Sequence, residues 1–221
     1  MRKLILVLTL FFVFVSSASA ATIFSDDFDS GANSAWGNEL GSWVTNGGVY
    51  DAQSISAYSS VTTFPSLTDF TVNVDINNLD DGGVMLRSSD WGNGVALITG
   101  GKGNGNFSGL YWHIKQNGSW GRILNEVYIP GLFGSDVSLQ IVVSGNKYSA
   151  YVNGATSPAT TLTTSVFSSG KVALYDNSRQ TFDNFSISTS TPVPEPATMS
   201  LFGLGLVLLV LYRKRMANGI Q

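Results

Sequence analysis

The chain has 221 residues, of which 12% are charged and 12% aromatic, and it contains no cysteine. So few charges exclude a coiled coil, the aromatic content excludes a disordered acidic chain, and the missing cysteines exclude thiol catalysis, zinc–thiolate sites and disulfides. Between Ala21 and Val193, seven Lys and Arg stand against fourteen Asp and Glu, a net charge of −7. Because this field repels a phosphate backbone, we expect no nucleic acid among the partners.

The N-terminus has the three parts of a secretory signal peptide. Arg2 and Lys3 supply the basic start, and Leu4–Val15 is an apolar run of 12 residues, too short to cross a hydrocarbon core of ~30 Å. Ser16–Ala20 ends in the small-x-small pattern that a signal peptidase accepts. We therefore expect residues 1–20 to be a signal peptide that is cleaved during export. The alternative is an uncleaved N-terminal membrane anchor.

The C-terminal segment combines a Pro-rich stretch, residues 191–198, with an apolar run and a basic cluster. The apolar run, Met199–Tyr212, has 14 residues, which as a helix would span about 21 Å and fall short of the hydrocarbon core. Arg213–Arg215 follow at once and favour the cytoplasmic side. We expect a short hydrophobic helix with its basic cluster over residues 199–215, which holds a precursor in the membrane transiently, and then a tail, residues 216–221.

Val193–Ala197 reads Val-Pro-Glu-Pro-Ala and precedes the apolar run and the basic cluster. This three-part order resembles a PEP-CTERM sorting signal. The resemblance implies a Gram-negative bacterium with an extracellular polysaccharide system, and an exosortase, a membrane cysteine transpeptidase that cuts near the motif, as a partner. Pro194, Glu195 and Pro196 would be recognised by that enzyme and would do no chemistry themselves. We therefore expect the protein at the cell surface or outside the cell.

The body of the chain, residues 21–190, is predicted to consist of short antiparallel strands. Phe70–Ile76 and Val137–Ile141 alternate between apolar and polar residues, which is typical of strands with one buried face. Asn46-Gly47 and Gly145-Asn146 separate such runs and predict tight hairpin turns. With polar outer faces, about a dozen such strands favour an antiparallel sandwich over a parallel sheet.

Six short segments follow one another along this body. They are Phe24–Asp29, Gly41–Tyr50, Asp69–Val72, Gly83–Arg87, Gly170–Tyr175 and Phe182–Phe185. In this order they resemble the concanavalin A-like lectin/glucanase sandwich, near the laminin G-like and family 16 glycoside hydrolase-like modules. The resemblance implies an all-β, antiparallel jelly-roll β-sandwich, a fold that hosts lectins, hydrolases and adhesion modules alike.

The acidic residues do not match a family 16 active site. That family places its carboxylates on one strand as Glu-x-Asp-x-x-Glu, whereas the only two Glu of the body, Glu39 and Glu126, lie outside such a pattern. A glycosidase needs two carboxyl groups roughly 5 to 9.5 Å apart. Asp80-Asp81 lies beside Gly82-Gly83 and is interpreted as a polar turn. We therefore expect that the protein is not an enzyme.

One strand supplies the candidate carbohydrate-binding residues. Tyr111, His113 and Lys115 alternate onto one face, which we expect to be open and to bind sugar. The opposite face is expected to be core: Leu110, Trp112 and Ile114. Trp120 offers an indole for the apolar face of a pyranose ring, and Arg87 is expected to point away from the core. The alternatives are a solvated strand face, a partly buried edge Trp and a surface Arg.

Asp27 and Asp183 are the candidate metal ligands. They come from the first and last expected strands, which commonly run side by side in sandwiches of this kind, and calcium prefers oxygen ligands such as carboxylates. The alternative is that both are exposed turn acids.

Together these features predict an exported surface or matrix protein that binds extracellular polysaccharide without cleaving it. One alternative is a glycoside hydrolase or lyase with an atypical site. The other is a purely structural biofilm component.

Overall fold

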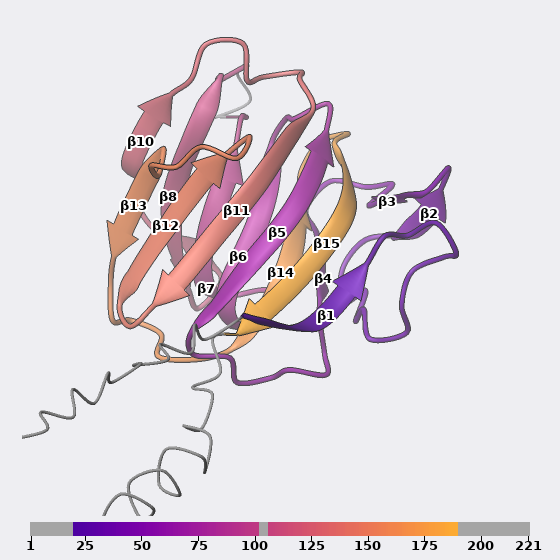
Figure 1. Cartoon of the computed structure of the whole chain (residues 1–221), viewed down its shortest axis with the longest axis horizontal. Helices are drawn as coiled ribbons and strands as arrows, with labels where there is room; N and C mark the ends of the chain where they lie inside the picture. The colour runs from indigo at the N-terminus through magenta and orange to yellow at the C-terminus, as the bar shows by residue number, and fades with distance from the viewer. Residues whose placement is uncertain (1–19, 102–105, 190–221) are drawn as a thin grey trace, which may run out of the picture. The chain divides into compact units, whose positions relative to one another are not determined.

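The computed structural model describes residues 20–101 and 106–189, and Ala21–Thr189 form one compact unit. This unit contains fifteen strands, which pair antiparallel in two sheets that lie face to face (Figure 1). The expected all-β antiparallel sandwich is therefore confirmed. The signal peptide and the C-terminal helix fall outside the described residues, and within those residues there is no helix with the length and hydropathy to cross a membrane.

Sheet 1 has eight strands. They are β1 (Ala21–Asp26), β2 (Val44–Asn46), β3 (Val49–Asp51), β5 (Phe70–Asn77), β11 (Val137–Ser144), β12 (Lys147–Val152), β13 (Thr160–Thr163) and β15 (Thr181–Thr189). Their order is β13-β12-β11-β5-β15-β3-β2, with β1 paired to β15.

Sheet 2 has seven strands. They are β4 (Ala57–Ser60), β6 (Gly82–Asp90), β7 (Asn93–Thr99), β8 (Gly109–Gln116), β9 (Ser119–Trp120), β10 (Leu124–Tyr128) and β14 (Lys171–Asp176). Their order is β10-β8-β7-β6-β14-β4, with β9 paired to β8.

The predicted hairpin turns are confirmed. Asn46 pairs with Val49 across Gly47-Gly48, and Ser144 pairs with Lys147 across Gly145-Asn146. Both residues of the Gly47-Gly48 turn have positive φ, 63° and 81°. Such a backbone matches the twist of the flanking strands, and glycine adopts it without steric cost.

The main core lies between the two sheets. In β5 the side chains alternate strictly between buried and partly exposed, as the apolar–polar alternation of Phe70–Asn77 predicts. Trp112 of β8 is fully buried, packs edge to face on Tyr148 of β12 and donates from its Nε1 to Thr160 Oγ1 at 3.2 Å. The indole therefore joins the two sheets and still has a partner for its polar atom.

Sheet 2 carries a second apolar cluster on its outer face, the face turned away from sheet 1. Its strands alternate between the two clusters: Met85 lies between Val84 and Leu86, and Ala96 between Val95 and Leu97. The cluster consists of Tyr58, Met85, Ala96, Ile98, Tyr111, Ala173 and Tyr175, with Trp91 and Phe107 packed against it. The expectation of polar outer faces therefore holds for sheet 1 and is wrong for sheet 2.

Candidate functional site

Aromatic side chains cross the outer face of sheet 2 from edge strand β10 to edge strand β4. We call this set the aromatic band, and it consists of Tyr58, Trp91, Phe107, Tyr111, His113, Trp120, Tyr128 and Tyr175. Neighbouring rings have centroids 5.3 to 6.2 Å apart. In the middle of the sheet, β7 and β14 also contribute the small side chains of Ala96 and Ala173 to this face.

A pocket of about 250 Å³ lies within the aromatic band. Its lining consists of Asp81, Ile98, Gly101, Tyr111, His113, Trp120, Tyr175 and Asn177. Asp81 and Asn177 form its polar end: Asn177 donates from Nδ2 to Asp81 Oδ2 at 3.0 Å and from its backbone N to the Asp81 carbonyl at 2.9 Å. Burial raises the pKa of the Asp81 carboxyl. The pocket thus has aromatic walls and one fixed hydrogen-bonding end.

Apart from Asp81, the titratable groups in the pocket lining are neutral at neutral pH. Burial raises the pKa of the Tyr111 and Tyr175 hydroxyls, and the nearby charge of Asp81 adds to both rises, so both hydroxyls keep their protons. Burial lowers the pKa of His113, whose Nδ1 lies 3.2 Å from the Arg122 carbonyl and donates to it. Neutral donors and acceptors between ring faces suit an uncharged, hydroxyl-rich ligand surface.

Three of the predicted binding residues line this pocket: Tyr111, His113 and Trp120. The predicted alternation of β8 is confirmed, because Leu110 and Trp112 are fully buried in the core between the sheets. Trp120 is 37% exposed, whereas Tyr111 is only 4% exposed because its ring packs into the outer cluster.

Lys115 lies on the expected face but is not open to solvent. Its side chain is 2% exposed, and its Nζ lies 3.1 Å from the ring centroid of Trp91 and 4.2 Å from that of Trp120. The prediction of an open contact residue is therefore wrong for Lys115. The two indoles cover the ammonium group through cation–π contacts, a preference that sequence alternation alone does not reveal.

Arg87 is a second correction. The register of β6 shifts between Leu86 and Asp90, and Arg87 has a φ of 47°, so a bulge turns its side chain to the interior, where it is 3% exposed. Its guanidinium donates to the carbonyls of Thr68, Gly145 and Phe167. It also donates to the Tyr148 hydroxyl at 3.2 Å. Arg87 therefore fixes loops of the sandwich and does not belong to the pocket.

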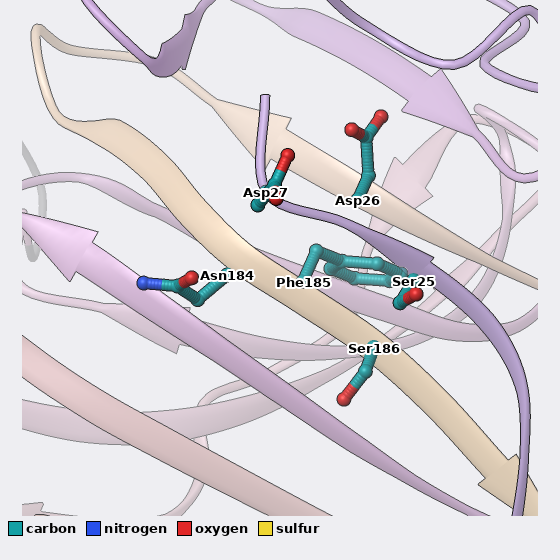
Figure 2. Close-up of a pocket in the computed structure, with 6 residues that line it drawn as sticks. All are labelled: Ser25, Asp26, Asp27, Asn184, Phe185 and Ser186. Carbon is teal, nitrogen blue, oxygen red and sulfur yellow. The ribbon is translucent and has the colours of Figure 1, made fainter. Parts of the chain in front are cut away.

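The calcium prediction assumed that the first and last strands run side by side. They do: β1 pairs with β15, with Asp26 opposite Phe185. Figure 2 shows Asp26 and Asp27 at the end of β1, beside Asn184 and Phe185 of β15. Asp26 Oδ2 accepts from the Trp36 indole N and the Asn33 backbone N, and so it stabilises the local loop.

The residues drawn in Figure 2 line a pocket that includes Asp27 but not Asp183. Asp183 Oδ1 instead accepts a hydrogen bond from the Asn184 backbone N. Within the residues that the structure describes, no three His, Asp or Glu side chains come together as a metal site. Calcium at Asp27 and Asp183 stays a prediction.

The sequence interpretation missed most residues of the band and pocket, among them Asp81, Trp91, Tyr175 and Asn177. One signal was available for Tyr175: its strand has apolar residues on both faces, with Leu174 on one and Tyr175 on the other, which indicates that both faces are covered. Asp81 was interpreted as a turn residue because it precedes Gly82-Gly83. Its position near Tyr175 and Asn177 results from the pairing of β6 with β14. Local sequence carries no signal for such a contact.

The C-terminal residues match a known family model, the PEP-CTERM protein-sorting motif, over residues 192–215. The C-terminus thus carries a PEP-CTERM motif. The predicted Pro194, Glu195 and Pro196 lie inside the matched range. A PEP-CTERM motif indicates an exported protein that an exosortase sorts, so export and this processing partner agree with the expectation. No curated protein sequence matches the chain significantly.

Solved structures share the sandwich. The carbohydrate-binding module CBM66 from Bacillus subtilis matches with a TM-score of 0.60 at 19% identity, covering 70% of this chain and 96% of that one. The family GH16 endo-β-1,3(4)-glucanase SCLam matches with a TM-score of 0.58 at 8% identity, covering 80% and 93%. The lumenal domain of VIP36, bound to Ca²⁺ and Man3GlcNAc, matches at 0.52 and 12% identity, covering 79% and 92%. These likenesses establish a concanavalin A-like fold for the body of the chain.

Proposed function

We propose that this PEP-CTERM protein binds polysaccharide at the cell surface, without cleaving it, through the aromatic band of sheet 2. The observation that carries the proposal is the pocket between Tyr111, Trp120 and Tyr175, with Asp81 and Asn177 at its polar end. Ring faces pack on the apolar face of a sugar, and a fixed carboxylate–amide pair accepts and donates hydrogen bonds to its hydroxyls. A carbohydrate-binding module among the structures of the same fold makes this use of the sandwich reasonable.

The length of the aromatic band favours a chain over a single sugar. The rings run without a break from Tyr128 at the β10 edge to Tyr58 at the β4 edge. Tyr128 is 65% exposed and lies outside the pocket lining. A ligand that covered Tyr128 and the pocket together would extend over several sugar units.

The carboxylates favour binding over hydrolysis. Among the described residues that line the pocket, Asp81 is the one carboxylate. Glycoside hydrolysis with two acidic groups needs a second one across the scissile bond. Asp176, the next acid along β14, faces the opposite side of the strand and is 1% exposed. This arrangement supports a binding protein.

A glycan array tests the proposal. We expect the wild-type protein to bind oligosaccharides, and Trp120→Ala to weaken that binding by about 2 kcal/mol, or roughly 30-fold, as is usual for a buried interface Trp. Tyr151→Ala, in a polar hollow on the outer face of sheet 1, is the matched control and should bind as wild type. No binding by the wild type, or equal loss in both variants, would contradict the proposal.

The sorting step has its own test. If the exosortase recognises Pro194-Glu195-Pro196, Glu195→Ala should leave residues 199–221 on the exported chain, while the wild type loses them. Intact-protein mass spectrometry distinguishes the two forms. Normal processing of the variant would mean that Glu195 is not part of the recognised motif.

A further inference from the structure

Lys115 is a buried cation whose hydrogen-bonding capacity is not used by the described part of the chain. An ammonium group has three N–H donors and no acceptor. Two ring faces, of Trp91 and Trp120, cover it, and their planes stand at 85° to each other. Within the described residues, no oxygen accepts from Nζ and no carboxylate lies within ion-pair distance of it. Among the described residues, the ammonium group therefore has only cation–π contacts with the protein.

The groups around Lys115 do not neutralise it. The carboxylate of Asp90 accepts from the Gly92 backbone N and from Asn93 Nδ2, at 2.6 and 3.0 Å through Oδ1, so its oxygens serve the β6–β7 turn. The other titratable neighbours, His113 and Tyr175, are neutral at neutral pH. Burial lowers the pKa of Lys115 to about 8, which the charge of Asp90 offsets only in part. A negatively charged group of a ligand would offset the desolvation penalty that burial imposes on the Lys115 ammonium.

We propose that the polysaccharide bound at the aromatic band carries a carboxylate, as a uronic acid residue does, and that Lys115 binds it. This inference rests on the proposed function. Trp120 is the exposed cover of the ammonium group and also a wall of the pocket, so a sugar that stacks on Trp120 has its substituents beside Lys115. For Lys115 Nζ to donate to the ligand, the Trp120 ring, which is 37% exposed, must move off the ammonium group.

The charges of the protein define the anion further. The body has a net charge of −7, so a polymer with a charge on every unit would be repelled. A single ammonium in an aromatic surrounding matches a single carboxylate, whereas a phosphate monoester would leave a second negative charge unpaired. The expected ligand is therefore a mostly neutral chain with spaced carboxylates.

The experiment compares uronic acid-containing oligosaccharides with their carboxyl-reduced counterparts, which differ only at the acid group. Wild type should bind the acidic form at least 10-fold more tightly. Lys115→Met, which keeps the length of the stem, should lose that preference and still bind the reduced form. Lys115→Arg, which stays charged, should keep it.

Changing the pH separates a binding role from a purely structural one. Because Lys115 loses its proton above a pH of about 8, the preference of the wild type for the acidic form should fall between pH 7 and pH 9.5. The preference of Lys115→Arg should stay constant. This arm uses folded wild type, so it holds even if Lys115→Met fails to fold.

The outcomes are distinct. If wild type binds the reduced form as well as the acidic one, the inference about Lys115 is wrong and the proposed function stands. If wild type binds no oligosaccharide of either kind, the proposed function fails and this inference fails with it. A preference that is independent of pH and equal in Lys115→Met would place the anion elsewhere.

Discussion

The two faces of sheet 2 are both rich in large apolar side chains, but sheet 1 covers only one of them. On β8, Leu110 and Trp112 point to the core, while Tyr111 and His113, which alternate with them, belong to the aromatic band. Burial of the first pair stabilises the fold. Aromatic residues on an outer face are not required to form a sandwich, because the outer face of sheet 1 is polar.

On the outer face of sheet 1, neighbouring strands are linked by side-chain hydrogen bonds. Gln140 Nε2 donates to Asn73 Oδ1 at 3.0 Å, and Asn184 Nδ2 donates to Asp75 Oδ2 at 2.9 Å. The same fold thus tolerates a hydrated outer face. The large apolar cluster on the corresponding face of sheet 2 is the difference on which the proposed binding function rests.

The largest effect should come from the core side of this comparison. Trp112→Ala removes a fully buried indole that joins the sheets, so the free energy of unfolding should fall by roughly 3–5 kcal/mol. Urea denaturation measures it. Val142→Ala, on a half-buried outer position of β11, is the control and should cost far less. A loss below 1 kcal/mol for Trp112→Ala would contradict the assignment of this face to the core.

The next effect concerns Asp176, which points to the core side of β14 next to the outward-facing Tyr175. Burial, with a smaller contribution from Asp51, raises the pKa of Asp176 to about 7. The unfolded chain releases this proton near pH 4, so between pH 4 and pH 7 the native state holds more protons than the unfolded state. The free energy of unfolding should therefore fall as pH rises through this window, by up to ~4 kcal/mol.

Asp176→Asn should remove that dependence and be more stable than wild type at pH 8. Thermal unfolding of both proteins at pH 5 and pH 8 measures the difference. If the wild type and the variant change in parallel with pH, another group is responsible. Asp81, whose pKa burial also raises, would then be the next to substitute.

The smallest effect should come from the outer face. Tyr111→Phe keeps the ring in the outer cluster and removes only the hydroxyl. The free energy of unfolding should change by less than about 0.5 kcal/mol, while glycan affinity falls by about 1 kcal/mol, or roughly 5-fold, for one lost hydrogen bond. Calorimetric titration measures the affinity, with Tyr151→Phe of sheet 1 as the control. Unchanged affinity would exclude the Tyr111 hydroxyl from the site.

Most of the fold was predictable because strand alternation and turn glycines are local signals. Phe70–Ile76 and the Gly145-Asn146 turn appear as expected. The alternation of β8 correctly separated Tyr111 from Trp112. Alternation gave the wrong side for Arg87, because a bulge in β6 changes the side to which its side chain points. The local sequence does not indicate this bulge.

The sequence by itself determined the sorting signal of the protein and the alternation of apolar and polar residues in its strands. The sorting motif is a linear signal, read by another protein in chain order, so it is visible without a fold. Only the tertiary structure decided what lies beside what: Asp81 beside Asn177, and Lys115 between Trp91 and Trp120. These contacts join segments far apart in the chain through the pairing of β6, β7, β8 and β14. The burial that shifts the pKa of Lys115 exists only after that pairing has formed.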